Sequence, residues 1–240
     1  MLENDPMTAA PLAWRSSSAT RCGLHHTVNE DAALELADAG VFTVADGMGG
    51  HTDGALASQS IVEIIRRVGY MHDSLDAKVA DIEAALHSVN EALWREAASR
   101  GGNVIIGSTV AVLVVSDHYA VCIWSGDSRI YLRRQDELYQ LTKDHTLQEE
   151  DGDAPGGIMT RAVGSAETLV LDRIVTTIED NDTFLVCSDG ITKALSDRDL
   201  NRLLAGPVEG LAARVVAAAV EAGSSDDISA ILVRCAEAGA

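Results

Sequence analysis

The chain has 240 residues, of which 37 are Asp or Glu and 18 are Lys or Arg, so its formal net charge is −19. A protein that binds nucleic acid or an anionic membrane through phosphate groups needs a basic face, and this charge balance opposes one. Hydrophobic residues make up 47% of the chain and charged residues 23%, which is far from the composition of disordered proteins. We therefore expect one folded domain, with no nucleic-acid partner and no membrane partner.

Targeting and redox features point to the cytoplasm. No basic segment followed by an apolar one opens the chain, as a secretory signal would require. The longest uncharged stretch, residues 101–116, is too short and too rich in Gly, Ser and Asn to span a bilayer. The four cysteines show no CxxC spacing, and three of them lie in apolar runs, which is typical of buried free thiols.

The first half of the chain begins with a polar segment and continues with helical patterns. We expect residues 1–18 to be flexible and a single domain to cover residues 19–238. The apolar run 41–45 ends at an Asp-Gly pair and predicts a buried strand. Apolar residues then recur at spacings of three and four, which predicts helices over residues 55–71 and 75–98.

The second half is richer in strands. Short polar turns separate several apolar segments, as in a series of hairpins, and an acidic Gly-rich loop interrupts them. The predicted strands cover residues 108–115, 119–124, 130–133, 138–141, 169–176, 183–187 and 228–233, and the predicted helices cover 197–204 and 208–222. This order favours an α+β fold, a four-layer αββα sandwich with two antiparallel sheets and helix pairs outside.

Carboxylates recur where the predicted strands begin or end. Glycine lies close to four of these positions, where it lets the backbone approach a ligand or turn a carbonyl inward. The acids are Glu30, Asp31, Asp46, Asp127, Asp189, Asp226 and Asp227. A single Asp-Gly pair after a strand is most often a simple turn. Several acids that converge would repel one another without cations, so together they predict a site for Mg²⁺ or Mn²⁺.

The motifs VADGMGGH, GDSR and SDG occur in this order along the chain. The segments that carry them, and those that accompany them, are residues 29–32, 44–51, 107–109, 126–132, 141–145, 160–164, 187–191 and 226–229. In this combination the sequence resembles the bacterial metal-dependent Ser/Thr protein phosphatases, type 2C (the PPM family), over about residues 20–235. The resemblance implies an αββα sandwich that hydrolyses phosphoserine and phosphothreonine in proteins.

The resemblance also implies a dinuclear Mn²⁺ or Mg²⁺ centre between the sheets. By this correspondence Asp46 bridges the two ions, and the carbonyl of Gly47 is a further ligand. Asp189 and Asp226 hold the first ion. A water shared by the two ions attacks phosphorus directly, so no phosphoenzyme forms.

Four further residues complete the implied site. Glu30 and Asp31 serve the second ion, partly through water. Asp127 resembles the acid that, together with Asp189, binds a third ion in bacterial members. A general acid must protonate the departing alkoxide, and His51, just beyond the metal loop, is the candidate with a suitable pKa.

The sequence departs from the family pattern in three places. Five residues before Asp31 the family has an arginine that binds the substrate phosphate, whereas this chain has His26; we expect His26, or another cation such as Arg21, to bind it. Asp227 stands where the family has Asn, and it would either tighten metal binding or require a proton. The loop over residues 145–160 is shorter than the usual flap, which predicts a more open cleft.

Two functional hypotheses follow. The first is a monomeric cytoplasmic phosphatase that acts on phosphorylated proteins and opposes a bacterial Ser/Thr kinase. The alternative is a regulatory binding module that keeps the fold but has lost catalysis, which His26 and the short flap favour. Asp46, Asp189 and Asp226 favour the enzyme, because such carboxylates cost stability when no metal binds them.

Overall fold

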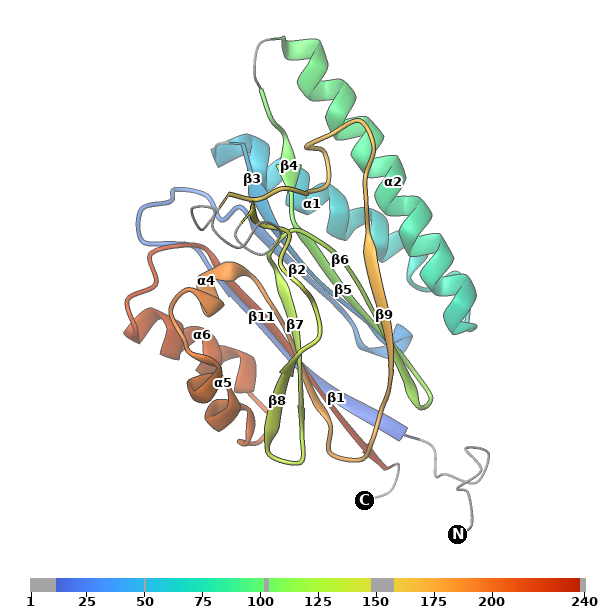
Figure 1. Ribbon diagram of the computed structural model, residues 1–240, viewed down its shortest axis with the longest axis vertical. Coiled ribbons are helices and arrows are strands. Elements are labelled where there is room, and N and C mark those ends of the chain that lie inside the picture. Colours follow the sequence, from blue (N-terminus) through green and yellow to red (C-terminus); the bar gives the residue numbers. More distant parts are fainter. Residues whose placement is uncertain (1–11, 50, 102–103, 148–157, 238–240) are drawn as a thin grey trace.

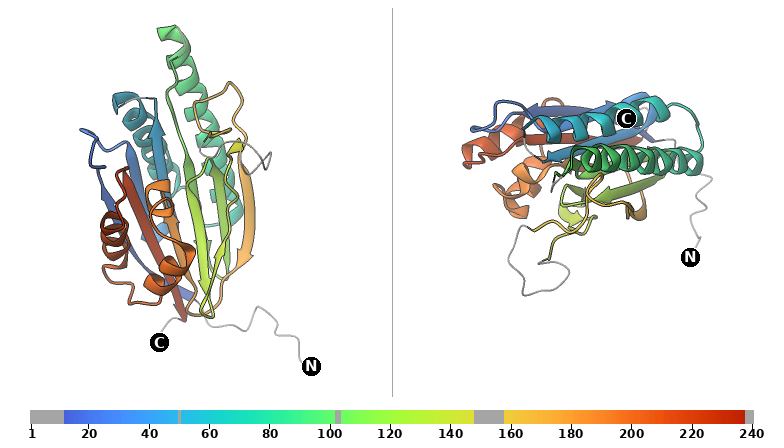
Figure 2. Two further views of the ribbon diagram at one scale, coloured as in Figure 1. Left: turned by 60° about the vertical axis from the view of Figure 1, so that its left-hand side comes forward. Right: turned by 90° about the horizontal axis from the view of Figure 1, so that it is seen from above.

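Two antiparallel β-sheets lie face to face, with helices on both outer faces (Figures 1 and 2). The computed structural model describes residues 12–49, 51–101, 104–147 and 158–237, and of residues 51, 52 and 237 only the backbone. The first sheet has the strand order β1-β11-β10-β7-β8. Its strands are β1 (Leu12–Arg21), β11 (Ile228–Glu237), β10 (Thr183–Cys187), β7 (Arg129–Arg134) and β8 (Glu137–Gln140).

The second sheet has the order β2-β3-β5-β6-β9, and the short β4 (Gly107–Ser108) pairs with the end of β3. Its strands are β2 (Asp31–Leu36), β3 (Val41–Met48), β5 (Val110–Ser116), β6 (Tyr119–Ser125) and β9 (Asp172–Thr177). The helices are α1 (His51–Val68) and α2 (Leu75–Arg100) on one side, and α4 (Asp189–Thr192), α5 (Asp197–Leu204) and α6 (Leu211–Glu221) on the other. The predicted αββα sandwich is confirmed.

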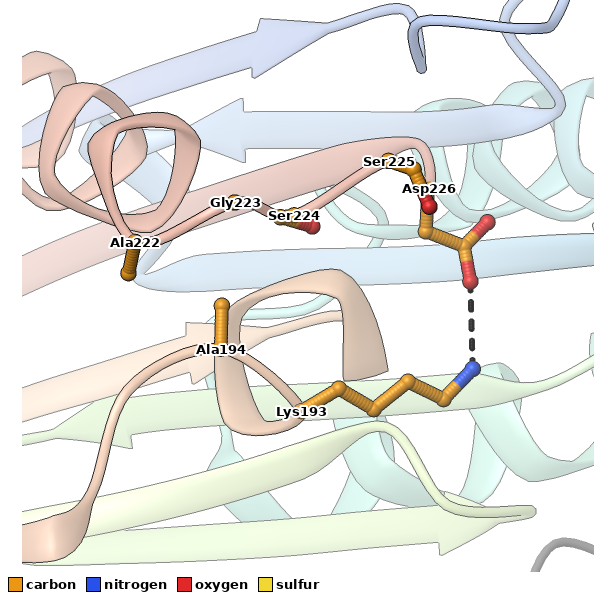
Figure 3. A pocket seen from close by; sticks show the side chains of 7 residues that line it. All are labelled: Lys193, Ala194, Ala222, Gly223, Ser224, Ser225 and Asp226. Carbon is orange, nitrogen blue, oxygen red and sulfur yellow. Dashed lines mark hydrogen bonds and ion pairs between the residues drawn. The ribbon is translucent and has the colours of Figure 1, made fainter.

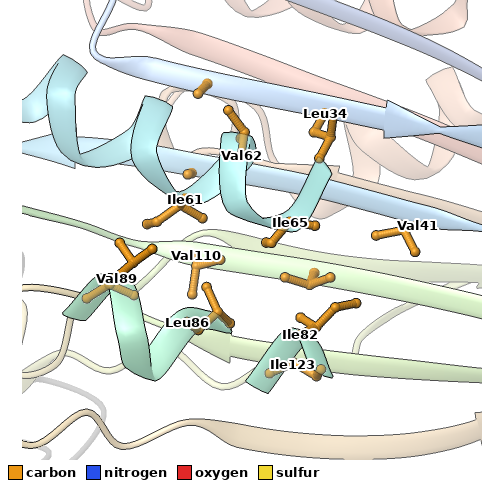
Figure 4. Close-up of a cluster of buried hydrophobic side chains, with 14 of the residues drawn as sticks. Leu34, Val41, Ile61, Val62, Ile65, Ile82, Leu86, Val89, Val110 and Ile123 are labelled. Carbon is orange, nitrogen blue, oxygen red and sulfur yellow. The ribbon is translucent and has the colours of Figure 1, made fainter. Parts of the chain in front are cut away.

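Three apolar clusters separate the four layers. The first lies between α1, α2 and the second sheet, where Ile61, Ile82 and Leu86 interlock with Val110 and Ile123 (Figure 4). A second cluster fills the space between the sheets, and a third lies between the first sheet and the helices α4, α5 and α6. Burial on both faces explains why the central strands read as continuous apolar runs, which is how the sequence predicted them.

The strand β1 corrects the prediction that residues 1–18 are flexible. Residues 12–18 belong to a ten-residue strand that pairs with β11 along its whole length. Its middle is rich in serine, a weak strand former, so the pattern predicted no strand there. Pairing with β11 stabilises it, and the indole N–H of Trp14 donates to the carbonyl of Ala37 at 2.8 Å. Residues 1–11 lie outside the described part of the chain.

Two smaller expectations concern membranes and thiols. Within the described residues, every helix is too short or too polar to cross a membrane. All four cysteines are free thiols, as predicted. Three of them are buried in the apolar layers, whereas Cys22, just after β1, is partly accessible.

Candidate metal centre

The acids predicted to converge do meet at one end of the sandwich. In the second sheet, Asp31 opens β2 and is paired directly with Asp46 near the end of β3. In the first sheet, Asp127 lies just before β7, Asp189 just after β10 and Asp226 just before β11. These strand ends coincide because β10 runs antiparallel to both of its neighbours. The fold therefore delivers carboxylates from both sheets to one edge.

Asp31 joins the two sheets at this edge. It is 3% exposed, and its Oδ2 accepts a hydrogen bond of 2.7 Å from the hydroxyl of Ser188, which lies at the end of β10. Its Oδ1 is buried and has no hydrogen-bond partner among the described residues. Burial raises the pKa of Asp31 to about 7. One oxygen of this carboxylate is therefore desolvated without compensation.

Asp46 lies at the centre of the cluster. Its backbone is fixed by Thr109, whose hydroxyl accepts from the Asp46 N–H at 3.0 Å and whose own N–H donates to the Asp46 carbonyl at 2.8 Å. Burial holds the pKa of its carboxyl well above the ordinary value, and the negative charges of Asp31, Asp189, Asp127 and Asp226 raise it further. Asp46 thus experiences the field of all four neighbouring acids.

Gly47 and Glu30 form a close backbone contact beside Asp46. The Gly47 N–H donates to the Glu30 carbonyl at 3.1 Å, and a Cβ at position 47 would collide with the carbonyls of Gly54 and Glu30. The Glu30 side chain is also buried, and its Oε2 lies against Gly54, where a Cβ would strike it. The glycines at 47 and 54 therefore let α1 approach the acids closely.

The acids of the first sheet surround a lysine. Asp189 begins α4, and Lys193 at the end of that helix reaches back to place Nζ 2.5 Å from Asp189 Oδ2 and 3.1 Å from Asp226 Oδ2. The Oδ1 of Asp189 is buried and has no hydrogen-bond partner among the described residues. Burial raises the pKa of Asp189, and it raises the pKa of Asp127 to about 6 with a further contribution from the charge of Asp189.

Asp227 is engaged in a different way from the other acids. Its Oδ1 accepts from the Gly23 N–H at 2.7 Å, its Oδ2 accepts from the Glu30 N–H at 2.6 Å, and His26 Nδ1 lies 3.1 Å from Oδ2. Burial acts to raise the pKa of Asp227, but the two backbone N–H groups and His26 outweigh it and hold the pKa below its ordinary value. These contacts favour a structural role over the predicted metal role, because Asp227 anchors the loop between β1 and β2.

The two departures from the family pattern, His26 and Asp227, therefore contact each other and form one pair. The hydrogen-bonding influence of Asp227 is the largest contribution to a raised pKa at His26, so the imidazole is held in its cationic form more readily than a free histidine. The sequence could not reveal this contact, because the two residues lie about two hundred positions apart.

A divalent cation fits this donor set. Within the described residues, no three His, Cys, Asp or Glu side chains already stand close enough together to hold a metal ion. However, the buried Oδ1 atoms of Asp31 and Asp189 have no hydrogen-bond partner in the described part of the chain, and the charges of the neighbouring acids add to burial in raising the pKa of Asp46. Hard carboxylate oxygens suit Mg²⁺ or Mn²⁺. Positive charge would remove the repulsion.

Comparison with known proteins decides the family. The sequence model of the family described as protein phosphatase 2C matches residues 22–232. The chain belongs to the protein phosphatase 2C family. The protein phosphatase PhpP of Streptococcus pneumoniae is 28% identical to it, over 89% of this chain and 94% of PhpP. The Ser/Thr protein phosphatase PstP of Mycobacterium tuberculosis is 27% identical over 94% of this chain, which corresponds to 46% of PstP.

Two solved structures are similar to this chain over almost its whole length. PppA, described as a key regulatory component of T6SS in Pseudomonas aeruginosa, superimposes with a TM-score of 0.89 at 37% identity, over 93% of this chain and 98% of PppA. The catalytic domain of PstP in complex with two manganese ions gives a TM-score of 0.84 at 26% identity, over 94% of this chain and 99% of that domain.

One residue of this phosphatase that the motifs did not single out is His145. Its Nδ1 accepts from the Gly126 N–H at 3.1 Å, its backbone N–H donates to the Gly126 carbonyl at 3.0 Å, and its Nε2 lies 3.1 Å from Asp172 Oδ2. Its ring stacks on Trp124 with centroids 6.1 Å apart. His145 therefore holds the turn that carries Asp127. Its place in the matching segment 141–145 was the available signal.

The remaining predicted residues of the phosphatase are less informative. Arg21 ends β1 opposite Ile228 and is exposed at the same edge as the acids. The backbone of His51 begins α1, but its side chain lies outside the described part of the structure. Most of the predicted short flap, residues 148–157, also lies outside the described residues.

Proposed function

We propose that this protein hydrolyses phosphoserine and phosphothreonine in proteins at a dinuclear Mn²⁺ or Mg²⁺ centre. The observation that carries the proposal is the convergence of Asp31, Asp46, Asp189 and Asp226 at one edge of both sheets, where the described structure gives the buried Oδ1 atoms of Asp31 and Asp189 no hydrogen-bond partner. The similarity to the PstP catalytic domain with its two manganese ions supports the same site.

Bound among these acids, two divalent ions would supply a water of lowered pKa and the charge that stabilises in-line displacement at phosphorus. Asp46 lies between both sets of ligands and is suited to bridge them. Asp189 and Asp226 serve the first ion, and Asp31 and Glu30 the second. We assign the carbonyl of Gly47, next to Asp46 in the chain, to the same set of ligands.

Further residues of this chain would handle the substrate. We assign phosphate binding to His26, oriented by Asp227, with Arg21 at the same edge. His51 would protonate the leaving alkoxide, and Asp127 with Asp189 would bind a third ion. We further propose that the protein acts in the cytoplasm as a monomer, on phosphoproteins that a Ser/Thr kinase produces. The relatives named as Ser/Thr phosphatases support the phosphoprotein substrates.

The test is hydrolysis of a phosphothreonine peptide in the presence of Mn²⁺. Asp46→Asn should lower kcat by about a thousandfold or more, because it removes the carboxylate shared by both ions. Asp76→Asn, an exposed acid at the start of α2, is the matched control and should behave as wild type. EDTA should abolish the wild-type rate. Activity that is indifferent to EDTA, or equal in Asp46→Asn, would contradict the proposal.

The alternative of a regulatory binding module rests on His26, which cannot offer the bidentate donor pair of an arginine. Calorimetric titration with Mn²⁺ alongside the activity assay distinguishes the two functions. Metal binding without turnover of any phosphopeptide would favour the module, whereas Mn²⁺ binding with turnover supports the enzyme.

A further inference from the structure

Lys193 places a positive charge among the proposed metal ligands. It lies one helical turn after Asp189, and its ammonium contacts Oδ2 of Asp189. The same ammonium contacts Oδ2 of Asp226 (Figure 3). Its charge also reaches Asp127, where it opposes the rise in pKa that burial causes. A single ammonium therefore contacts two of the carboxylates assigned to metal binding and acts through its charge on a third.

Lysine is rare in this chain, and the three lysines differ in what surrounds their ammonium groups. The sequence has only three lysines, Lys78, Lys143 and Lys193, against fifteen arginines. Lys78 is buried and its ammonium donates to the carbonyl of Ala39, whereas Lys143 is exposed. Lys193 is 60% exposed as a side chain, so only its charged end is held in place.

A pocket beside the lysine offers room for it to move. The pocket has a volume of about 380 Å³ and is lined by small residues in addition to Lys193 and Asp226. They are Ala194, Ala222, Gly223, Ser224 and Ser225. Because none of these side chains is large, the four-carbon stem of Lys193 can swing away from the acids without disturbing the core.

The ammonium and a divalent ion compete for the same oxygens. A metal ligand must approach the ion to about 2.1 Å, so Mn²⁺ or Mg²⁺ on Asp189 and Asp226 would lie where the ammonium now donates. Like charges at that separation repel strongly in a partly buried site. Before metal binds, the same ammonium offsets part of the repulsion among the acids.

We propose that Lys193 is an internal counter-cation that occupies Asp189 and Asp226 in the metal-free protein and is displaced towards the adjacent pocket when the metal binds. Lys193 thereby lowers metal affinity and stabilises the metal-free fold. The inference rests on the metal site of the proposed function, and it concerns the lysine rather than the reaction.

Metal affinity provides the first test. In calorimetric titrations with Mn²⁺, Lys193→Gln should bind the metal about tenfold more tightly than wild type, because no ion pair must be broken. Lys193→Arg keeps the positive charge, so its affinity for Mn²⁺ should stay as low as that of wild type. Lys143→Gln changes the net charge equally and should match wild type, which controls for long-range electrostatics. The metal-free Lys193→Gln protein should also unfold at a lower temperature than wild type.

Amine acylation followed by mass spectrometry provides a structural test, with Lys143 as the internal standard. Without metal, Lys193 should react more slowly than Lys143, because its ammonium is held by two carboxylates. Saturating Mn²⁺ should raise the rate at Lys193 several-fold and leave Lys143 unchanged.

The outcomes separate this inference from the proposed function. If wild type binds Mn²⁺ but Lys193→Gln binds it no more tightly, the lysine does not compete and the inference is wrong, while the metal site stands. Equal acylation of Lys193 and Lys143 without metal would also overturn it. If neither wild type nor Lys193→Gln binds Mn²⁺, the metal site itself is wrong.

Discussion

A buried carboxylate lies at each end of strand β10, and the two differ in how many hydrogen-bond partners the fold gives them. Asp182, just before the strand, is 1% exposed and fully paired: Arg134 donates from Nε to Oδ1 at 2.9 Å and from Nη2 to Oδ2 at 2.6 Å, and the Glu179 N–H donates to Oδ2 at 2.8 Å. Asp189, just after the strand, keeps a buried oxygen with no partner within the described structure. Lys193 contacts its other oxygen, and the remaining charged groups that act on it are the acids Asp226 and Asp144.

The difference indicates which end is structural and which is built for a ligand. A buried charge is tolerated when its partners are supplied by the fold, as at Asp182. A cluster of buried acids without such partners costs free energy, and a fold keeps it when something else supplies the positive charge. At the Asp189 end the described part of the chain supplies one lysine, Lys193, to Asp127, Asp189 and Asp226, which leaves most of the negative charge of the cluster for cations from solution.

Removing Asp182 should have the largest effect on stability. Asp182→Ala leaves the Arg134 guanidinium partly buried without its main partner, so we expect it to lower the free energy of unfolding by about 3–5 kcal/mol. Urea denaturation of the metal-free protein measures this. Asp76→Ala, at an exposed position, should change the free energy by about 0.5 kcal/mol or less. A loss near that of Asp76→Ala would show that the Arg134 pair contributes nothing, and the contrast between the ends would fail.

The acids at the Asp189 end of β10 should make the stability of the metal-free protein depend on pH. Burial raises the pKa of Asp31 to about 7 and the pKa of Asp127 to about 6, above the ordinary value of 3.8. The folded chain then binds protons more tightly than the unfolded chain, so the stability of the metal-free protein should fall as pH rises from about 4 to about 7. We expect a melting temperature at pH 5 that is higher than at pH 7.5 by about 5 °C.

Variants and metal isolate the contribution of the cluster to this pH dependence. The change should be smaller in Asp127→Asn, which lacks one of the carboxylates, and unchanged in Asp76→Asn. Saturating Mn²⁺ should raise the melting temperature more at pH 7.5 than at pH 5, because protons compete with the metal for the same oxygens. Equal melting temperatures at both pH values would contradict the interpretation that burial in the acid cluster raises the pKa values of Asp31 and Asp127.

Most of the fold could be predicted from the sequence, because burial leaves a clear pattern. The strands β3, β5, β10 and β11 are apolar runs, and α1 and α2 show helical spacing. The serine-rich β1 and the short β2 were missed, since their stability comes from pairing with strands far along the chain rather than from local propensity.

The site was predictable in part, for a similar reason. Acids at strand ends must meet when antiparallel strands pair, so the convergence of Asp46 and Asp189 follows from the sequence pattern. Which groups contact those acids does not follow. The contact of Asp227 with the loop at Gly23 and Glu30 joins opposite ends of the chain, and only the spacing of four between Asp189 and Lys193 was visible locally.

An exposed ion pair, Glu63–Arg67, shows how little a carboxylate–guanidinium pair stabilises the fold when water surrounds it. On α1, Glu63 Oε1 accepts from both Nε and Nη2 of Arg67 at 3.1 Å, and the two side chains are 54% and 67% exposed. The groups are the same kind as in the Arg134–Asp182 pair, but water solvates them almost as well when they are apart. Arg67→Ala should therefore lower the free energy of unfolding by about 0.5 kcal/mol or less.

A double-mutant cycle makes the comparison direct. The coupling energy between Glu63 and Arg67 should be about 0.3 kcal/mol and should vanish in 1 M salt, because solvent ions screen exposed charges over about 3 Å. The coupling between Arg134 and Asp182 should be several times larger and should survive the salt, since bulk ions cannot enter the buried pair. Equal couplings would mean that burial does not set the strength of these pairs, and the contrast between the two ends of β10 could then no longer be explained by desolvation.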